Sequence, residues 1–158
     1  MTVLRWPSAP AGAKRRRQKG RPRETAASHF TREVPIVKAG ATIAEIRVVL
    51  QARRFASVAD VAVCDDGQLQ GLIRIEDVLA ADGETAAKEL MDADPPVVHP
   101  GEDQEVAAWK AVRHGEGSLA VVDENGAFVG LIPPPALIGI FLHEHDEDMA
   151  RLGGYQWA

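Results

Sequence analysis

The chain contains a single cysteine among its 158 residues, and only 5% of its residues are aromatic. One cysteine, Cys64, excludes an internal disulfide framework and fits a reducing compartment. The longest uncharged stretch, residues 126–142, holds three consecutive prolines and is shorter than the roughly 20 apolar residues that a membrane-spanning helix needs. We therefore expect a strand, a turn and the start of a helix there. Arg5, Pro7 and Pro10 interrupt the first apolar stretch, which predicts no signal peptide.

Charge is distributed unevenly along the chain. Residues 1–30 contain eight Lys or Arg and one acid, a net charge of +7, whereas residues 31–158 contain ten Lys or Arg and 22 acids, a net charge of −12. The basic arm, residues 1–30, has no apolar period and is predicted to be disordered. A basic arm is expected to bind an anionic surface, which is lipid headgroups, nucleic acid or the acidic body itself. The alternative is a solvated tail with no partner. The acidic body argues against nucleic-acid recognition as the main activity.

The acidic body contains the same pattern twice. Three glycine-containing motifs recur in order, pairing Gly40 with Gly101, Asp66-Gly67 with Asn125-Gly126, and Gly71-Leu72-Ile73 with Gly130-Leu131-Ile132. Each copy predicts a short strand, a helix, two strands joined by a tight turn, and a second helix. In the first copy, Thr42 and Glu45 form a capping-box pattern ahead of an apolar stripe at helical spacing. The long strands are expected at residues 58–64 and 119–122.

This β-α-β-β-α arrangement, repeated twice, resembles the tandem cystathionine-β-synthase-type module, the CBS pair, over about residues 31–142. The most diagnostic piece is Gly71-Leu72-Ile73 with Asp77 four residues later, and a second is the segment 87–103, with Met91 just before the second copy. The resemblance implies an α+β fold, in which two repeats form one pseudo-symmetric module followed by a C-terminal helix. It also implies a homodimer formed through the repeats.

The resemblance further implies adenosine-nucleotide clefts between the repeats. In that family an Asp accepts hydrogen bonds from ribose hydroxyls, and a Thr or Ser three residues before it contacts phosphate. The first copy keeps the Asp as Asp77 and carries Arg74 in place of the hydroxyl, which can still pair with phosphate. The second copy has Pro133 and Ala136 at these positions, so its site is expected to be lost. The alternative for Asp77 is a carboxylate that only favours the start of a helix.

The C-terminal segment, residues 143–154, concentrates four carboxylates within five residues. It resembles the segment of the MgtE family of magnesium transporters in which the CBS pair leads into a connecting helix, on Glu144, Glu147-Asp148, Leu152 and Gly153-Gly154. Residues 102–107 are also typical of that family. In it the CBS pair dimerises, and bound Mg²⁺ holds the cytosolic part compact and the pore shut.

This second resemblance implies a regulatory Mg²⁺ site at Glu144, Glu147 and Asp148. These residues fall on one face of a helix, and Mg²⁺ binds through one or two carboxylates at a time. It also implies a transmembrane pore domain as partner, in cis or in trans, and a place at the inner face of the cell membrane, where the basic arm would meet anionic lipid. The alternative is a solvated charged helix. His143 and His145 face apart on a helix, which disfavours a transition-metal site.

No catalytic constellation is evident, so we expect a protein that is not an enzyme. The expected organisation is a basic arm at 1–30, repeats at 31–90 and 91–142, and an acidic connecting helix with a tail at 143–158. A module that senses adenosine nucleotides for some other partner, and a purely structural dimerisation module, remain the two alternatives. The chain is either a piece of a longer transporter or free-standing.

Overall fold

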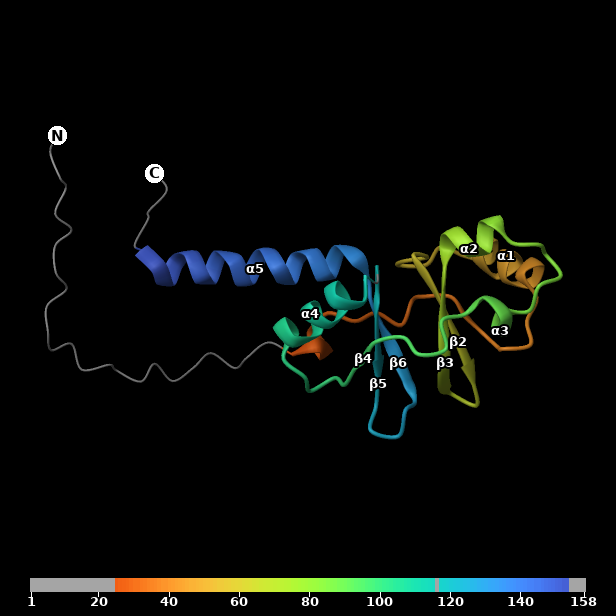
Figure 1. Cartoon of the computed structure of the whole chain (residues 1–158), viewed down its shortest axis with the longest axis horizontal. Coiled ribbons are helices and arrows are strands. Elements are labelled where there is room, and N and C mark those ends of the chain that lie inside the picture. The colour runs from red at the N-terminus through yellow and green to blue at the C-terminus, as the bar shows by residue number, and fades with distance from the viewer. Residues whose placement is uncertain (1–24, 116, 154–158) are drawn as a thin grey trace, which may run out of the picture.

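The computed structural model describes residues 25–115 and 117–153 (Figure 1). A short 3-10 turn, η1 (Ala26–Ser28), precedes the first repeat. The first repeat comprises β1 (Ile36–Val37), α1 (Ile43–Ala52), β2 (Asp60–Asp65), β3 (Gln68–Arg74), α2 (Ile75–Ala80) and α3 (Ala87–Leu90). The second comprises β4 (Val97–Val98), α4 (Gln104–His114), β5 (Leu119–Val122), β6 (Phe128–Ile132) and α5 (Pro134–Gly153).

Each repeat contributes one three-stranded sheet, and the two sheets have the same topology. In both, the short first strand pairs in parallel with the middle strand, which pairs antiparallel with the third. Both middle strands even carry an irregularity at the same place, between Val63 and Cys64 and between Val121 and Val122. The predicted α+β fold and its internal duplication are therefore confirmed. The first long strand begins at residue 60, two residues later than expected.

Local sequence explains how the first helix of each repeat begins and how the hairpin of the first repeat turns. Thr42 Oγ1 accepts a hydrogen bond from Glu45 N (3.2 Å) and Glu45 accepts one from Thr42 N (3.1 Å), the predicted capping box. Asp103 caps α4 by accepting from a backbone N–H in its first turn. The β2–β3 turn places Asp66 and Gly67 at positive φ, as an Asp-Gly hairpin turn requires.

The segment that precedes β1 packs against the second repeat and not against its own. Thr25 forms an isolated bridge with Asp103, and Thr31 exchanges two backbone hydrogen bonds with Leu131 of β6 (2.8 and 3.0 Å). Ala26 is fully buried in the core of the second repeat. This segment, residues 25–31, is therefore structurally part of the second repeat, and the predicted disordered arm is wrong for residues 25–30; residues 1–24 lie outside the described part of the chain.

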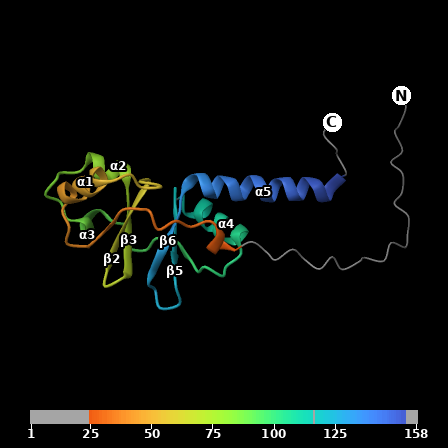
Figure 2. The same cartoon turned by 180° about the vertical axis from the view of Figure 1, so that it is seen from behind.

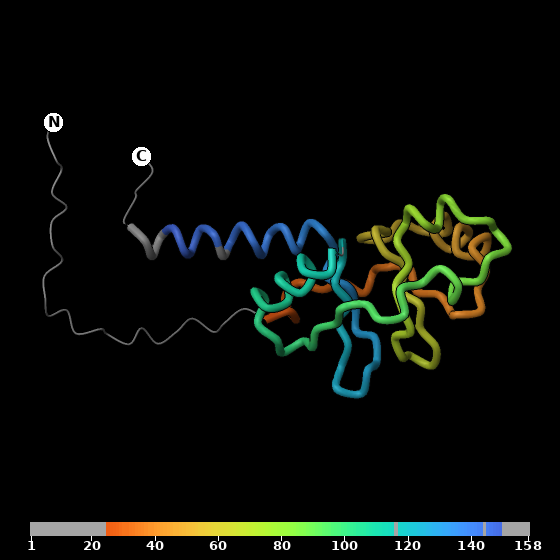
Figure 3. Tube along the Cα trace, viewed as in Figure 1, coloured from red at the N-terminus to blue at the C-terminus, as the bar shows by residue number. Residues whose placement is uncertain are grey.

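The segment that precedes β4 does the same on the first repeat. Ala86 bridges Thr42, Ala87 is fully buried in the core of the first repeat, and Asp92 exchanges two backbone hydrogen bonds with Leu72 of β3 (2.8 and 3.1 Å). These three positions lie 61 residues after Thr25, Ala26 and Thr31. The repeats are therefore crossed, since each is completed by the segment that precedes the other. Figure 3 shows both segments running between the two lobes.

Two glycines allow this crossing. A methyl group on Gly130 would come 2.5 Å from the carbonyl oxygen of Thr31, and one on Gly71 would collide with the carbonyl oxygen of Asp92. Because real Cβ atoms do not approach so closely, both positions require glycine for the close passage of the crossing segment. The glycine of the repeated Gly-Leu-Ile motif therefore has a packing role in each copy.

The apolar core has three parts. One lies within each repeat, between its sheet and its helices. The third joins the sheets and consists of Val34, Ala62, Cys64, Leu72, Ala120 and Leu131. Cys64 is 8% exposed, and burial together with the neighbouring Asp65 carboxylate raises the pKa of its thiol to about 11. Cys64 thus packs as a small apolar side chain, as the sequence suggested.

The helix that ends the second repeat continues without a break into the acidic segment. Pro134 and Pro135 occupy its first turn, where the missing N–H groups would have no helical partner. Leu137 and Ile140 bury the first half against the core, and the second half projects away from both lobes (Figures 1 and 2). The sequence had suggested a short helix followed by a separate connecting helix. Along the described part of the chain, no helix is both long and apolar enough to cross a bilayer.

Candidate functional site

A cleft at the junction of the two repeats contains both predicted nucleotide-site residues. Arg74 ends β3, Asp77 lies in the first turn of α2, and Asp60 begins β2 directly opposite Arg74 in the strand ladder. These three residues line two cavities of about 460 and 270 Å³. The structure therefore brings Arg74 and Asp77 together, while their role stays a prediction.

The walls of the cleft come from both repeats. The larger cavity is closed by Gly115, Gly117 and Pro134 of the second repeat. The smaller one is closed by the segment that precedes β4, through Leu90, Met91 and Asp92. A ligand here would contact both repeats, so its affinity would depend on how the two repeats are placed relative to each other.

The cleft is strongly acidic. Four carboxylates line the two cavities, those of Asp60, Glu76, Asp77 and Asp92, and Arg74 is the one basic residue among the described lining residues. Asp60 is 2% exposed, whereas Arg74 and Asp77 are exposed. Sequence reasoning missed Asp60 and Asp92. A carboxylate at the head of an otherwise apolar strand was the available signal for Asp60.

The corresponding positions of the second repeat differ in chemistry. Ser118 stands where the first repeat has Asp60, and Pro133 and Ala136 stand where it has Arg74 and Asp77. In addition, the ring of Phe30 lies against Gly130, where the first repeat has the thinner side chain of Met91 against its own glycine. These replacements remove the charged groups and fill space, while the loss of a site in the second repeat stays a prediction.

The predicted metal residues lie on α5, where the structure gives them different neighbours. Glu147 Oε1 is 3.4 Å from His143 Nε2, one turn earlier on the helix. Asp148 instead borders a groove of about 400 Å³ between α4 and α5, together with His145 and Trp109. The side chain of Glu144 lies outside the described part of the chain. Among the described side chains, no three His, Cys, Asp or Glu groups lie close enough together to hold a metal ion.

Several outer helices carry exposed apolar side chains. The rings of Trp109 on α4 and Phe141 on α5 form a T-shaped pair at a centroid distance of 5.8 Å. Other exposed apolar residues on helices are Val106 and Val112 of α4, Ile138, Leu142 and Met149 of α5, and, in the first repeat, Val48 of α1 and Leu79 of α2. Exposed apolar surface of this kind is typical of an interaction face.

Comparison with known proteins agrees with this architecture. The family model of the CBS domain matches residues 27–84 and 87–141. The magnesium transporter MgtE of Thermus thermophilus is 30% identical over 129 residues, which cover 78% of this chain and 28% of that protein.

Two solved structures are similar over most of the chain. The soluble part of a magnesium transporter is 26% identical with a TM-score of 0.71, and the match covers 77% of this chain and 48% of that one. The cytosolic domain of the Mg²⁺ channel MgtE in complex with ATP is 27% identical with a TM-score of 0.70, over 75% of this chain and 49% of that one. The chain therefore spans about half the length of these structures and under a third of the full transporter.

Proposed function

The chain belongs to the CBS domain family, and we propose that it is the cytosolic regulatory module of an MgtE-like magnesium transporter. In this proposal it is a regulatory protein without catalytic chemistry. It senses Mg²⁺ through the acidic second half of α5 and passes the signal to a transmembrane pore domain, in cis or in trans. Anionic lipid at the membrane is then one partner for the basic arm, in competition with the acidic surface of the chain itself.

The observation that carries this proposal is the continuity of α5. The helix is anchored by Leu137 and Ile140 in the core of the second repeat, and the same element then carries the exposed Asp146 and Asp148 and the half-buried Glu147. Any force on the acidic half is therefore transmitted directly to the repeat. Similarity to the soluble part of a magnesium transporter supports the choice of cation.

Carboxylates on one helical face repel one another, and a divalent cation removes that repulsion. A single helix offers too few ligands, so we propose that Mg²⁺ bridges α5 to a second acidic surface brought close by homodimerisation. The exposed apolar residues of the outer helices, including Leu79 and Trp109, support such a dimer. Cation binding then favours a compact state over a loose one, by its difference in affinity for the two.

The test is the Mg²⁺ response of the chain after its predicted ligands are neutralised. Thermal unfolding and small-angle scattering are measured with and without a few millimolar Mg²⁺, beside Ca²⁺ and at matched ionic strength. A ligand that binds only the folded state stabilises it by RT ln(1 + [L]/Kd). We expect Mg²⁺ to raise the midpoint and reduce the radius, and the triple variant Glu144→Gln, Glu147→Gln, Asp148→Asn to lose both effects.

A matched control removes three charges from elsewhere on the surface. Glu84, Glu89 and Glu124 are exposed and lie away from α5, so their replacement by Gln changes the net charge equally. This control should keep the Mg²⁺ response. An equal loss of response in both triple variants would show a general charge effect and refute the site.

The second candidate function is adenosine-nucleotide sensing in the Asp77 cleft. It is favoured by the cavities at the repeat junction and by similarity to a cytosolic domain in complex with ATP. Because the cleft has four carboxylates and one guanidinium, a nucleotide whose phosphates carry Mg²⁺ should bind better than free ATP.

Calorimetric titration compares the binding of ATP with and without Mg²⁺ and tests whether the nucleotide occupies the Asp77 cleft. We expect ATP with Mg²⁺ to bind more tightly than ATP with a chelator, and Asp77→Ala to abolish binding of both by removing the ribose acceptor. Glu89→Ala serves as the control, since this residue is exposed and does not line the cleft. Tight binding of free ATP that Asp77→Ala leaves unchanged would rule out this cleft.

A further inference from the structure

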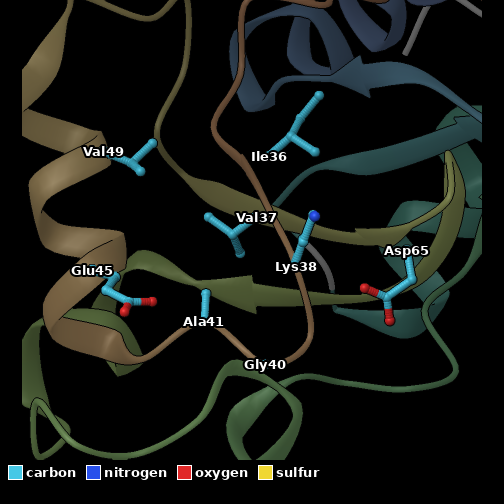
Figure 4. Close-up of a pocket in the computed structure, with 8 residues that line it drawn as sticks. All are labelled: Ile36, Val37, Lys38, Gly40, Ala41, Glu45, Val49 and Asp65. Carbon is cyan, nitrogen blue, oxygen red and sulfur yellow. The ribbon is translucent and has the colours of Figure 1, made fainter.

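A second cleft lies beside β1 in the first repeat, away from the repeat junction. It has a volume of about 490 Å³ and runs between β1 and α1. Its apolar walls are formed by Ile36, Val37, Ala41 and Val49. Figure 4 shows Glu45 of α1 and Asp65 of β2 on opposite sides of β1, each with its carboxylate turned toward that strand.

The internal duplication shows what fills the equivalent place in the second repeat. There Lys110 of α4 lies along the helix toward β4, and its Nζ donates to the carbonyl oxygen of Val97 (3.2 Å). The same Nζ meets the Glu102 carboxylate at 3.0 Å. Partial burial alone would raise the pKa of Glu102, but hydrogen bonds from Lys110 and from the backbone of His99 outweigh it and hold the pKa below its usual value.

The three residues of this contact have direct counterparts in the first repeat. Positions 61 residues before Val97, Glu102 and Lys110 are Ile36, Ala41 and Val49, and all three line the open cleft. The strand register agrees, because Ile36 faces Ala62 as Val97 faces Ala120. The first repeat thus keeps the backbone acceptor but lacks both the lysine that would fill the cleft and the glutamate that would bind it.

The first repeat places carboxylates at the rim instead. Glu45 accepts the capping hydrogen bond of Thr42 N (3.1 Å), and Asp65 Oδ1 accepts a long one from Ala39 N (3.4 Å). Each carboxylate has several acceptor positions, so both retain capacity for a cation. Lys38 is the one basic side chain in the described lining, which leaves acids in excess. Apolar walls with an acidic rim fit a long aliphatic side chain that ends in a positive charge.

We propose that this cleft receives the side chain of Lys14 or Lys19 from the chain's own basic segment, residues 14–23, in the way that Lys110 fills its counterpart. The segment contains seven Lys or Arg and no acid. It precedes Thr25, where the described part of the chain begins. Residues 31–158 carry a net negative charge, opposite to that of the segment. Charge complementarity and the filled cleft of the second repeat therefore point to the same occupant.

Carbodiimide coupling of the full chain tests the contact, because the reagent joins only a carboxylate and an amine that already touch. We expect the amines of Lys14 and Lys19 to couple to Glu45 or Asp65, as mapped by mass spectrometry of peptides. The exposed carboxylates Glu84, Glu89 and Glu124 provide the background level within the same molecule. If the two lysines couple to Glu45 and Asp65 no more than to these background carboxylates, the proposal is overturned.

A second experiment fills the cleft from within. The double variant Ala41→Glu, Val49→Lys rebuilds in the first repeat the pair that Glu102 and Lys110 form in the second. If the basic segment occupies the cleft, this variant displaces it, and limited trypsin digestion of the segment should become faster by about threefold or more. The double variant Glu45→Gln, Asp65→Asn should act similarly while keeping the helix cap, because Gln also serves in a capping box.

The digestion control is Glu84→Gln with Glu124→Gln, which removes two charges from outside the cleft and should leave the rate unchanged. Far-ultraviolet circular dichroism verifies that each variant is folded. A digestion rate unaffected by both cleft variants would refute the proposal, and so would an equal acceleration in the control. Coupling of the cleft carboxylates only to lysines outside residues 14–23 would assign the cleft to another occupant.

Discussion

Replacing Gly71 or Gly130 by alanine should destabilise the protein, because each glycine makes room for a crossing segment. The added methyl would lie 2.5 Å from Thr31 O at position 130 and would collide with Asp92 O at position 71. The obstructing atoms are backbone carbonyls that are themselves hydrogen-bonded to β6 and β3, so they cannot swing aside as a flexible side chain would. Relief requires moving the segment and lengthening those hydrogen bonds.

Insertion of one methyl group into a packed region of this kind costs about 1–3 kcal/mol. At roughly 2–4 °C per kcal/mol for a chain of this size, each variant should lower the unfolding midpoint by several degrees. Urea unfolding followed by circular dichroism measures the free energy directly. We expect similar losses at Gly71 and Gly130, since the two environments are related by the internal duplication.

Gly40→Ala and Gly101→Ala are the matched controls. They also occupy equivalent positions in the two repeats, but a methyl group there meets nothing within 4 Å and the backbone does not need positive φ. Their stability should be unchanged or slightly raised, because alanine reduces the entropy of the unfolded chain. If the variants at Gly71 and Gly130 were as stable as these controls, the close passage of the crossing segments would be wrong.

Two further predictions concern single side chains. Cys64, whose thiol has a pKa raised to about 11, should react with a thiol reagent at neutral pH only as fast as the protein opens, and denaturant should make labelling fast; rapid labelling of the native chain would contradict its burial. The pKa of Glu102 is held below its ordinary value near 4.5, so its contribution to stability is present above that pH and is lost as pH falls through the lower, folded-state value. Lys110→Met should therefore reduce the stability at neutral pH and make the loss of stability in acid smaller. Urea unfolding from neutral to acidic pH measures both effects. An unchanged acid profile would exclude the Glu102–Lys110 pair as a source of the pH dependence.

The sequence predicted those parts of the fold that depend on neighbouring residues. The capping box at Thr42 and the Asp66-Gly67 turn are local patterns, and both appear in the structure as expected. The duplication was visible because related positions keep the same chemistry. The order of strands and helices along the chain followed once the two copies were recognised.

The crossing of the repeats could not be predicted in the same way. Residues 25–31 carry no pattern that distinguishes packing on the first repeat from packing on the second, because the choice depends on contacts about a hundred residues away in the chain, such as that between Thr31 and Leu131. The continuity of α5 was missed for a different reason, since the change from uncharged to acidic residues suggested a division of the helix at residue 143, although its prolines fall in the first turn as expected. Prolines disturb a helix only when they fall inside it.

The site was predicted in part. Arg74 and Asp77 were identified from one motif and do line one cleft, but Asp60 enters that cleft from another strand, and Asp92 from the crossing segment. The clustering of these carboxylates is a property of the tertiary fold. The cleft beside β1 also emerges only when the two repeats are compared in three dimensions, because Val49 and Ala41 are unremarkable until they are set against Lys110 and Glu102.

The crossed segments also determine how the gene for such a protein can be divided. The family match assigns residues 27–84 to one domain and 87–141 to the other, yet Thr31 contributes its backbone to the sheet of the second and Ala87 its side chain to the core of the first. A cut between the two matched regions therefore yields fragments that each carry a piece belonging to the other and lack a piece of their own. Such fragments should fold only when mixed, by mutual complementation, so that the smallest unit available for duplication, fusion or transfer between proteins is the pair.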